Sequence, residues 1–132
     1  MTKKLSILFG AVFVLVGVLG FIPNPIVGMG GLFETNMAHN IVHLVVGLIL
    51  LAVASKETSA ALAMKLFGVV YLLIAALGFF MGGGMVLGFL TVNGADNWLH
   101  VVLGVALLAA GFSGGKAVAV PMASGGMPGR PV

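Results

Sequence analysis

The sequence contains no cysteine and few charged side chains. Its six basic and three acidic residues amount to 7% of 132 residues, whereas soluble domains carry about 25%. Without cysteine, disulfides, thiolate metal sites and cysteine nucleophiles are excluded. A net charge of +3 from so few groups makes no polyanion-binding surface, so we expect no nucleic-acid partner.

Charged residues are also missing from the centre of every long apolar run. Proton relays, ion pathways and voltage sensors normally need such a residue inside the membrane. No glycine-rich loop followed by Lys-Ser or Lys-Thr is present to bind phosphates. We therefore predict that the protein is not an enzyme, and we assign no catalytic residue and no dedicated metal site.

Hydrophobic residues are abundant, at 61% of the chain, which is more apolar surface than a small soluble domain can bury. Four apolar runs each approach the roughly 20 residues that span a bilayer as a helix. They predict an all-α, integral membrane four-helix bundle. The predicted helices cover about 5–22, 38–54, 62–81 and 97–112, with a loop at 55–61 and a Gly/Pro-rich tail at 113–132.

Lys3 and Lys4 before the first run resemble the start of a secretory signal. No small-residue A-x-A cleavage site follows, and the run has a similar partner later in the chain. We therefore interpret it as the first membrane helix.

The two halves of the chain resemble each other at an offset of 58 and then 57 residues. The aligned segments are LFGAVFVL at 8–15 with LFGVVYLL at 66–73, and NMAHNIVH at 36–43 with NGADNWLH at 93–100. This alignment predicts two tandem helix–loop–helix repeats, 1–54 and 62–112, related by a pseudo-twofold axis along the membrane normal.

The basic residues predict the orientation in the membrane. All six lie near the N-terminus, near the middle loop or in the tail, and the loops at 23–35 and 82–96 have none. Because positive residues stay inside, both termini and the middle loop are predicted to be cytoplasmic, in an inner or thylakoid-type membrane. The two outer loops are apolar and glycine-rich, so we expect them to fold back onto the helix ends.

Each predicted repeat carries one polar pattern, with residues at i, i+4, i+7 and i+11 on one helix face. The pattern consists of Asn36, Asn40, His43 and Gly47 in the first repeat, and of Asn93, Asn97, His100 and Gly104 in the second. In a structural interpretation, Asn40 and Asn97 cap the helix starts. The imidazoles then bond to asparagine or backbone across the bundle, and the glycines allow close helix approach.

A cofactor interpretation is the alternative. His43 and His100 lie at similar depth, and glycine one turn below each leaves room for a macrocycle, so they are candidate ligands of heme iron or chlorophyll magnesium. A metal or quinone contact is a further alternative. His39 stands where the second half has Asp96, and the two either form an exposed ion pair or stay solvated. The hydroxyl of Tyr71 is expected to bond to a carbonyl one turn away.

The segment from Asn93 to Gly104, together with Asn40-x-x-His43-x-x-x-Gly47, resembles the small four-helix bacterial membrane proteins grouped as domain of unknown function 4383 (DUF4383). The resemblance covers roughly Lys3 to Phe112, and the repeated Asn-x-x-His motif is its most specific part. It implies the four-helix membrane topology and supplies no activity.

We expect a small structural or accessory subunit of a larger membrane complex, photosynthetic or respiratory. Its partners are the lipid bilayer and other membrane subunits or copies of itself. This expectation rests on a chain that has almost no reactive side chains and has glycine-rich helix faces. Alternatives are a heme- or chlorophyll-binding subunit that uses His43 and His100, and a small-molecule carrier, which the missing mid-membrane charge disfavours.

Overall fold

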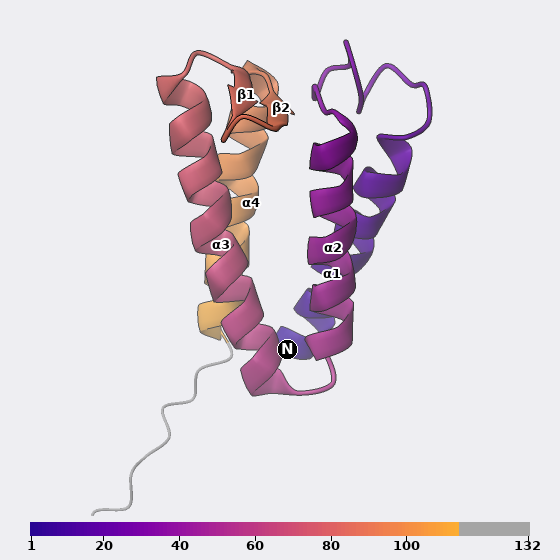
Figure 1. Cartoon of the computed structure of the whole chain (residues 1–132). Coiled ribbons are helices and arrows are strands. Elements are labelled where there is room, and N and C mark those ends of the chain that lie inside the picture. Colours follow the sequence, from indigo (N-terminus) through magenta and orange to yellow (C-terminus); the bar gives the residue numbers. More distant parts are fainter. Residues whose placement is uncertain (114–132) are drawn as a thin grey trace, which may run out of the picture.

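The computed structural model describes residues 1–113 of the chain, and the predicted tail beyond Ser113 lies outside the described residues. It confirms an all-α fold with four helices. These are α1 (Thr2–Leu19), α2 (Met37–Val53), α3 (Glu57–Phe80) and α4 (Gly94–Ser113). α1 packs mainly on α2, and α3 packs mainly on α4, so two helix pairs stand side by side (Figure 1).

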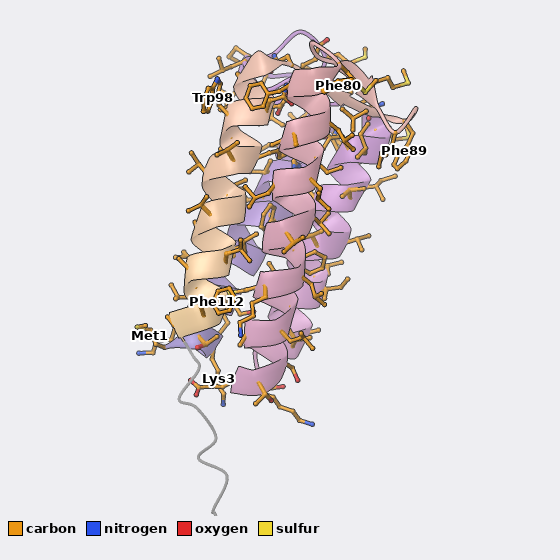
Figure 2. The ribbon with its side chains drawn as sticks, turned by 90° about the vertical axis from the view of Figure 1, so that its left-hand side faces the viewer. Met1, Lys3, Phe80, Phe89, Trp98 and Phe112 are labelled. Atoms are coloured by element: carbon orange, nitrogen blue, oxygen red, sulfur yellow. The ribbon has the colours of Figure 1, made fainter. Side chains whose placement is uncertain are left out.

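The outward faces of the bundle are apolar. α1, α3 and α4 are each long and apolar enough to cross a membrane, and α2 is an apolar helix of 17 residues. Leu8, Leu15, Leu66 and Leu73 are each 58% exposed, and Figure 2 shows side chains projecting outward along the whole length of α3 and α4. Soluble monomers rarely expose apolar patches of this extent, so the fold indicates a membrane protein.

Glycine brings the helices of each pair close together. A Cβ added to Gly47 on α2 would lie 2.7 Å from the backbone nitrogen of Val14 and 2.8 Å from the carbonyl oxygen of Gly10, both on α1. A Cβ added to Gly104 on α4 would lie 3.0 Å from the carbonyl oxygen of Gly68 on α3. Because the obstacle is backbone, no larger residue fits without separating the helices.

The two pairs meet in a buried core. The largest of its side chains come from all four helices, so this core joins one pair to the other. They are Phe13, Val46, Leu50, Met64, Tyr71 and Leu107.

Four helix boundaries differ from the prediction by three residues or more, and two of them are the earlier starts of α1 at Thr2 and of α4 at Gly94. α1 ends at Leu19, before the predicted end near 22, because the residue before Pro23 is disfavoured in helical conformation and the side-chain amide of Asn24 donates to the Leu19 carbonyl at 2.9 Å. α3 begins at Glu57, so the loop expected at 55–61 is largely helical. The prediction missed this first turn because it is polar and lies outside the apolar run. The turn starts with Glu57, and an acidic residue favours a helix N-terminus.

The predicted caps at Asn40 and Asn97 are wrong by one turn. Asn36 caps α2 by accepting a hydrogen bond from the His39 backbone N–H at 3.0 Å. In α4, the Asn93 side chain accepts from the Asp96 backbone N–H, and the Asp96 carboxylate accepts from the Asn93 backbone N–H. This reciprocal capping box satisfies two backbone donors at once.

The second outer loop forms a small antiparallel hairpin, which the sequence did not predict. β1 (Gly84–Val86) pairs with β2 (Leu90–Val92), and three of the hairpin's side chains are buried against α2 and α3. The capping asparagines reach across to the opposite loops: the Asn36 amide donates to the Phe89 carbonyl at 2.8 Å, and the Asn93 amide donates to the Leu32 carbonyl at 3.0 Å. The end of the bundle at which α2 and α4 begin is therefore held by contacts between the two helix pairs.

Candidate functional site: a buried histidine cluster

Three histidines meet inside the bundle. His39 and His43 lie one turn apart on the same face of α2, and His100 projects from α4. Their ring centroids are 4.6 Å apart for His39 and His43, 5.5 Å for His39 and His100, and 6.4 Å for His43 and His100. One ligand nitrogen from each ring lies within 4.8 Å of the other two. All three side chains are buried, at 2–4% exposure.

One contact fixes the orientation of His39. Its Nδ1 lies 2.7 Å from the Thr91 carbonyl oxygen on β2. A carbonyl only accepts hydrogen bonds, so Nδ1 carries the proton and donates it, and the lone pair of Nε2 is left for another partner. Metal-ligating histidines are commonly oriented in this way by a backbone carbonyl.

The other two histidines carry buried nitrogens without a partner. Nδ1 of His43 and Nδ1 of His100 make no hydrogen bond to any residue in the 1–113 range. A buried polar atom left unsatisfied costs about 1–3 kcal/mol. Two such atoms therefore lie in the same cluster, and neither is engaged by a hydrogen bond to the described residues.

Tyr71 of α3 borders the cluster. Its ring centroid lies 5.2 Å from that of His100 and 6.4 Å from that of His43. The hydroxyl is buried and bonds to nothing within the described part of the chain, so the carbonyl partner expected one turn away is not used. Phe13 of α1 packs on Tyr71 at 5.2 Å and on His43 at 5.8 Å between the ring centroids.

His39 and Asp96 neither form an exposed ion pair nor stay solvated, which were the two alternatives left open by the sequence. Both side chains are buried rather than exposed at the outer surface, and the acidic group is engaged in the α4 cap. Among residues 1–113, the ion pair present joins the N-terminal amine of Met1 to Glu57 at 3.2 Å, at the opposite end of the bundle.

Asn40 and Asn97 lie inside α2 and α4, next to Gly20, the C-cap of α1, and Gly78, in the last turn of α3. An added Cβ on Gly20 would collide with Asn40, and one on Gly78 would collide with Asn97. Both asparagines are 2% exposed, and neither Oδ1 has a hydrogen-bond partner in the described region. They flank the histidines and are separate from the cluster itself.

The structure thus brings together His43 and His100, the two histidines singled out from the sequence, and adds His39 and Tyr71. His39 lies four residues before His43, so the spacing alone placed both on one helix face. His39 was nevertheless left out of the candidate site, because it aligns with Asp96 in the second repeat and not with a histidine. Nothing in the sequence located Tyr71 beside the histidines, because that proximity depends on how α3 packs against α4, which carries His100, and against α2, which carries His43.

The fold and the cluster define a class: a four-helix, membrane-type bundle with a buried polar centre near one end. Within this class the chain belongs to the family described as Domain of unknown function (DUF4383), whose model matches residues 3–113. The resemblance drawn from the Asn-x-x-His motifs is thereby confirmed. Comparisons with curated proteins and with solved structures give no match.

Proposed function

We propose that the chain is an integral membrane protein that binds one transition-metal ion through His39, His43 and His100. The observation that carries this proposal is the convergence of three buried imidazoles, with one ligand nitrogen from each lying within 4.8 Å of the others. Imidazole is a preferred ligand of zinc, copper, iron and nickel.

The geometry requires a small contraction on binding. A tetrahedral zinc ion with bonds of about 2.0–2.1 Å holds its ligands about 3.3 Å apart. The three nitrogens therefore need to approach one another by up to about 1.5 Å. The Nδ1 atoms of His43 and His100 are not held by hydrogen bonds within residues 1–113, so no hydrogen bond at Nδ1 opposes the rotation of these two rings. Three protein ligands leave one coordination position open, as in zinc sites that bind a substrate or water.

A bare ion suits this site better than a macrocycle. A heme or chlorophyll held between His43 and His100 would have to pass through the volume that the His39 ring occupies against both of them. Tyr71 and Phe13 fill the adjacent sides. We therefore propose a metal ion in place of the heme or chlorophyll predicted for His43 and His100.

The number of membrane spans and their orientation are part of the same proposal. We propose four membrane spans with both termini cytoplasmic, in which the two helix pairs are tandem repeats. The positive residues support this orientation, and the recurrence of Gly–Gly and Gly–Asn contacts in both pairs supports the repeats. In this orientation the capped ends of α2 and α4 face outward, so the histidine cluster lies close to the outer surface.

The test is metal analysis of protein purified from its native membrane and of protein reloaded with Co²⁺ in detergent. We expect about one ion per chain and the visible absorption of four-coordinate cobalt. Alanine at any one of the three histidines should lower the affinity at least tenfold. Tyr71→Phe is the matched control, because it changes the same cluster without removing a proposed ligand. Substoichiometric metal, or metal retained by the triple alanine variant, would overturn the proposal, and a Soret band would restore the heme alternative.

A second candidate is the accessory subunit of a larger membrane complex. Its support is the outer end of the bundle, where Met29 and Phe80 are 87% and 90% exposed, and where Phe80 and Phe89 project from the bundle in Figure 2. Crosslinking in native membranes tests this candidate. A partner joined at residues 29 or 80 would support it, and a chain that is found only as a monomer would contradict it.

A further inference from the structure

One lysine interrupts the apolar outward face of the α3–α4 pair. Lys65 lies within α3 and is half-buried, and Leu62 and Val69, one turn before and one turn after it, are 58% and 48% exposed. Phe112, near the end of α4, is 65% exposed beside it. Because an unpaired charge at the edge of hydrocarbon is costly, this side chain calls for a partner of opposite charge.

Contacts with α4 fix the position of that charge. A Cβ added to Gly111 would lie 2.8 Å from Cγ of Lys65, so the aliphatic stem of the lysine lies against α4. The ammonium nitrogen lies 4.4 Å from the centroid of the Phe112 ring, which is an attractive cation–π contact. Since side chains tilt toward the N-terminus of their helix, the ammonium is directed toward the end of the bundle at which α3 begins.

No acidic side chain of the protein is placed to neutralise Lys65. The chain has three acidic residues. Glu57 pairs with the N-terminal amine at 3.2 Å. Glu34 precedes α2 and Asp96 lies in the first turn of α4, so both belong to the opposite end of the bundle (Figure 1). The counter-charge for Lys65 therefore comes from another molecule.

The same end of the bundle carries further positive charge. Lys3, Lys4 and Lys56 are exposed there, and Glu57 is the one acidic side chain of the chain at this end. Figure 2 shows Lys3 and Phe112 together at this end. Such a surface complements a negatively charged partner, and basic residues at a membrane boundary attract anionic lipids.

An anionic phospholipid matches both parts of this surface. Its phosphate lies where a helix leaves the hydrocarbon, and its acyl chains cover the apolar face beyond that level. A soluble anion would match the charge and leave the apolar face uncovered. We propose that Lys65 and Phe112 bind one anionic phospholipid, with the Lys65 ammonium paired to the phosphate and the Phe112 ring packed against the lipid.

The α1–α2 pair lacks the equivalent groups. The residue 58 places before Lys65 is Ile7, which is 51% exposed, and the residue 57 places before Gly111 is Ala54. Neither the cation nor the glycine against which its stem packs is therefore repeated in the first pair. The proposed lipid site is specific to α3 and α4, and it goes beyond the metal site, which lies among other residues.

The experiment uses brominated lipids, which quench a tryptophan that they contact. The chain has a single tryptophan, Trp98, which Figure 2 shows at the opposite end of the bundle from Phe112. A reporter protein carries Trp98→Phe and Phe112→Trp, and it keeps an aromatic ring beside Lys65. The full chain is reconstituted in bilayers of phosphatidylglycerol and phosphatidylcholine, in which one lipid or the other is brominated at fixed composition.

We expect phosphatidylglycerol to bind beside the introduced tryptophan about fivefold more tightly than phosphatidylcholine, as one lysine near anionic lipid supplies. Lys65→Met keeps the stem and removes the charge, so the preference should fall below about 1.5-fold, whereas Lys65→Arg should retain it. Lys56→Met is the matched control, because it removes an equal charge from the same end of the bundle and should leave a preference of at least about threefold.

Equal quenching by the two lipids in the reporter protein would overturn the proposal, and so would a preference that survives Lys65→Met. Equal losses in Lys65→Met and Lys56→Met would assign the attraction to the overall charge of this end and would also overturn the site. Lys65→Gln is a second neutral variant in case Lys65→Met does not fold. Protein with its native Trp98 should show no preference, because the chain has no basic residue near that end.

Discussion

Nδ1 of His39 lies 2.7 Å from the carbonyl oxygen of Thr91, and this hydrogen bond ties the first helix pair to the hairpin of the second. It is available because the residue three places after the α2 cap is histidine. In α4 that position is Asp96, whose carboxylate turns back to its own cap. In α2, the side chain at this position therefore bonds to the other helix pair, while in α4 it bonds back to its own cap residue.

This asymmetry predicts opposite effects of phenylalanine at the two α2 histidines. In metal-free protein, His39→Phe keeps a ring in the cluster but leaves the Thr91 carbonyl unpaired, and it should lower stability by about 1–3 kcal/mol. His43→Phe removes a buried nitrogen that bonds to nothing in residues 1–113, so it should be neutral or stabilising. Thermal unfolding in detergent, followed by circular dichroism, measures both. Equal destabilisation by the two variants would contradict the assigned hydrogen bond.

Glycine at the helix crossings predicts a second contrast. Gly47→Ala would place a methyl group 2.7 Å from a backbone nitrogen of α1, and because backbone cannot move aside locally, we expect a loss of about 1–3 kcal/mol. Gly94→Ala is the control, since nothing lies within 4 Å of an added Cβ there. It should be neutral or stabilising by up to about 1 kcal/mol, owing to the better helix propensity of alanine. Denaturation by sodium dodecyl sulfate distinguishes them, and similar midpoints would show that the crossing is loose.

The sequence predicted those parts of the structure that follow from local periodicity. The four helices and the common face of the two Asn-x-x-His motifs required only apolar runs and a 3.6-residue repeat. The helix caps were assigned wrongly, to Asn40 and Asn97, because both asparagines of each motif are good caps. The one that lies outside the apolar run, Asn36 or Asn93, turned out to be the cap.

The features that the sequence missed depend on long-range packing or on rare backbone conformations. The β1–β2 hairpin turns through Leu87 at a φ of +54°, followed by Gly88 at +78°. A leucine seldom adopts positive φ, so no turn signal marked this site. The position of Tyr71 beside His100 arises from contact between α3 and α4 and has no counterpart in sequence spacing.

The contact between Gly78 and Asn97 predicts a non-additive pair. Gly78→Ala alone forces a methyl group onto the buried Asn97 amide and should cost about 1–3 kcal/mol. In an Asn97→Ala background the obstacle is gone, so adding Gly78→Ala should cost less than about 0.5 kcal/mol. A double-mutant cycle on unfolding free energies gives the coupling. Simple additivity would mean that the two residues are not in contact in the folded protein.

The absence of cysteine makes the proposed orientation directly measurable. We introduce single cysteines at Met29 and Met85 in the outer loops and at Ser55 next to the short loop between α2 and α3; all three positions are exposed. In intact cells an impermeant maleimide should label Met29→Cys and Met85→Cys, and Ser55→Cys only after permeabilisation, because the basic residues favour an inside position for that loop. Membranes opened by detergent, in which all three sites should react, provide the control. The reverse pattern would place the histidine cluster at the inner surface, and a metal ion would then reach it from the cytoplasm.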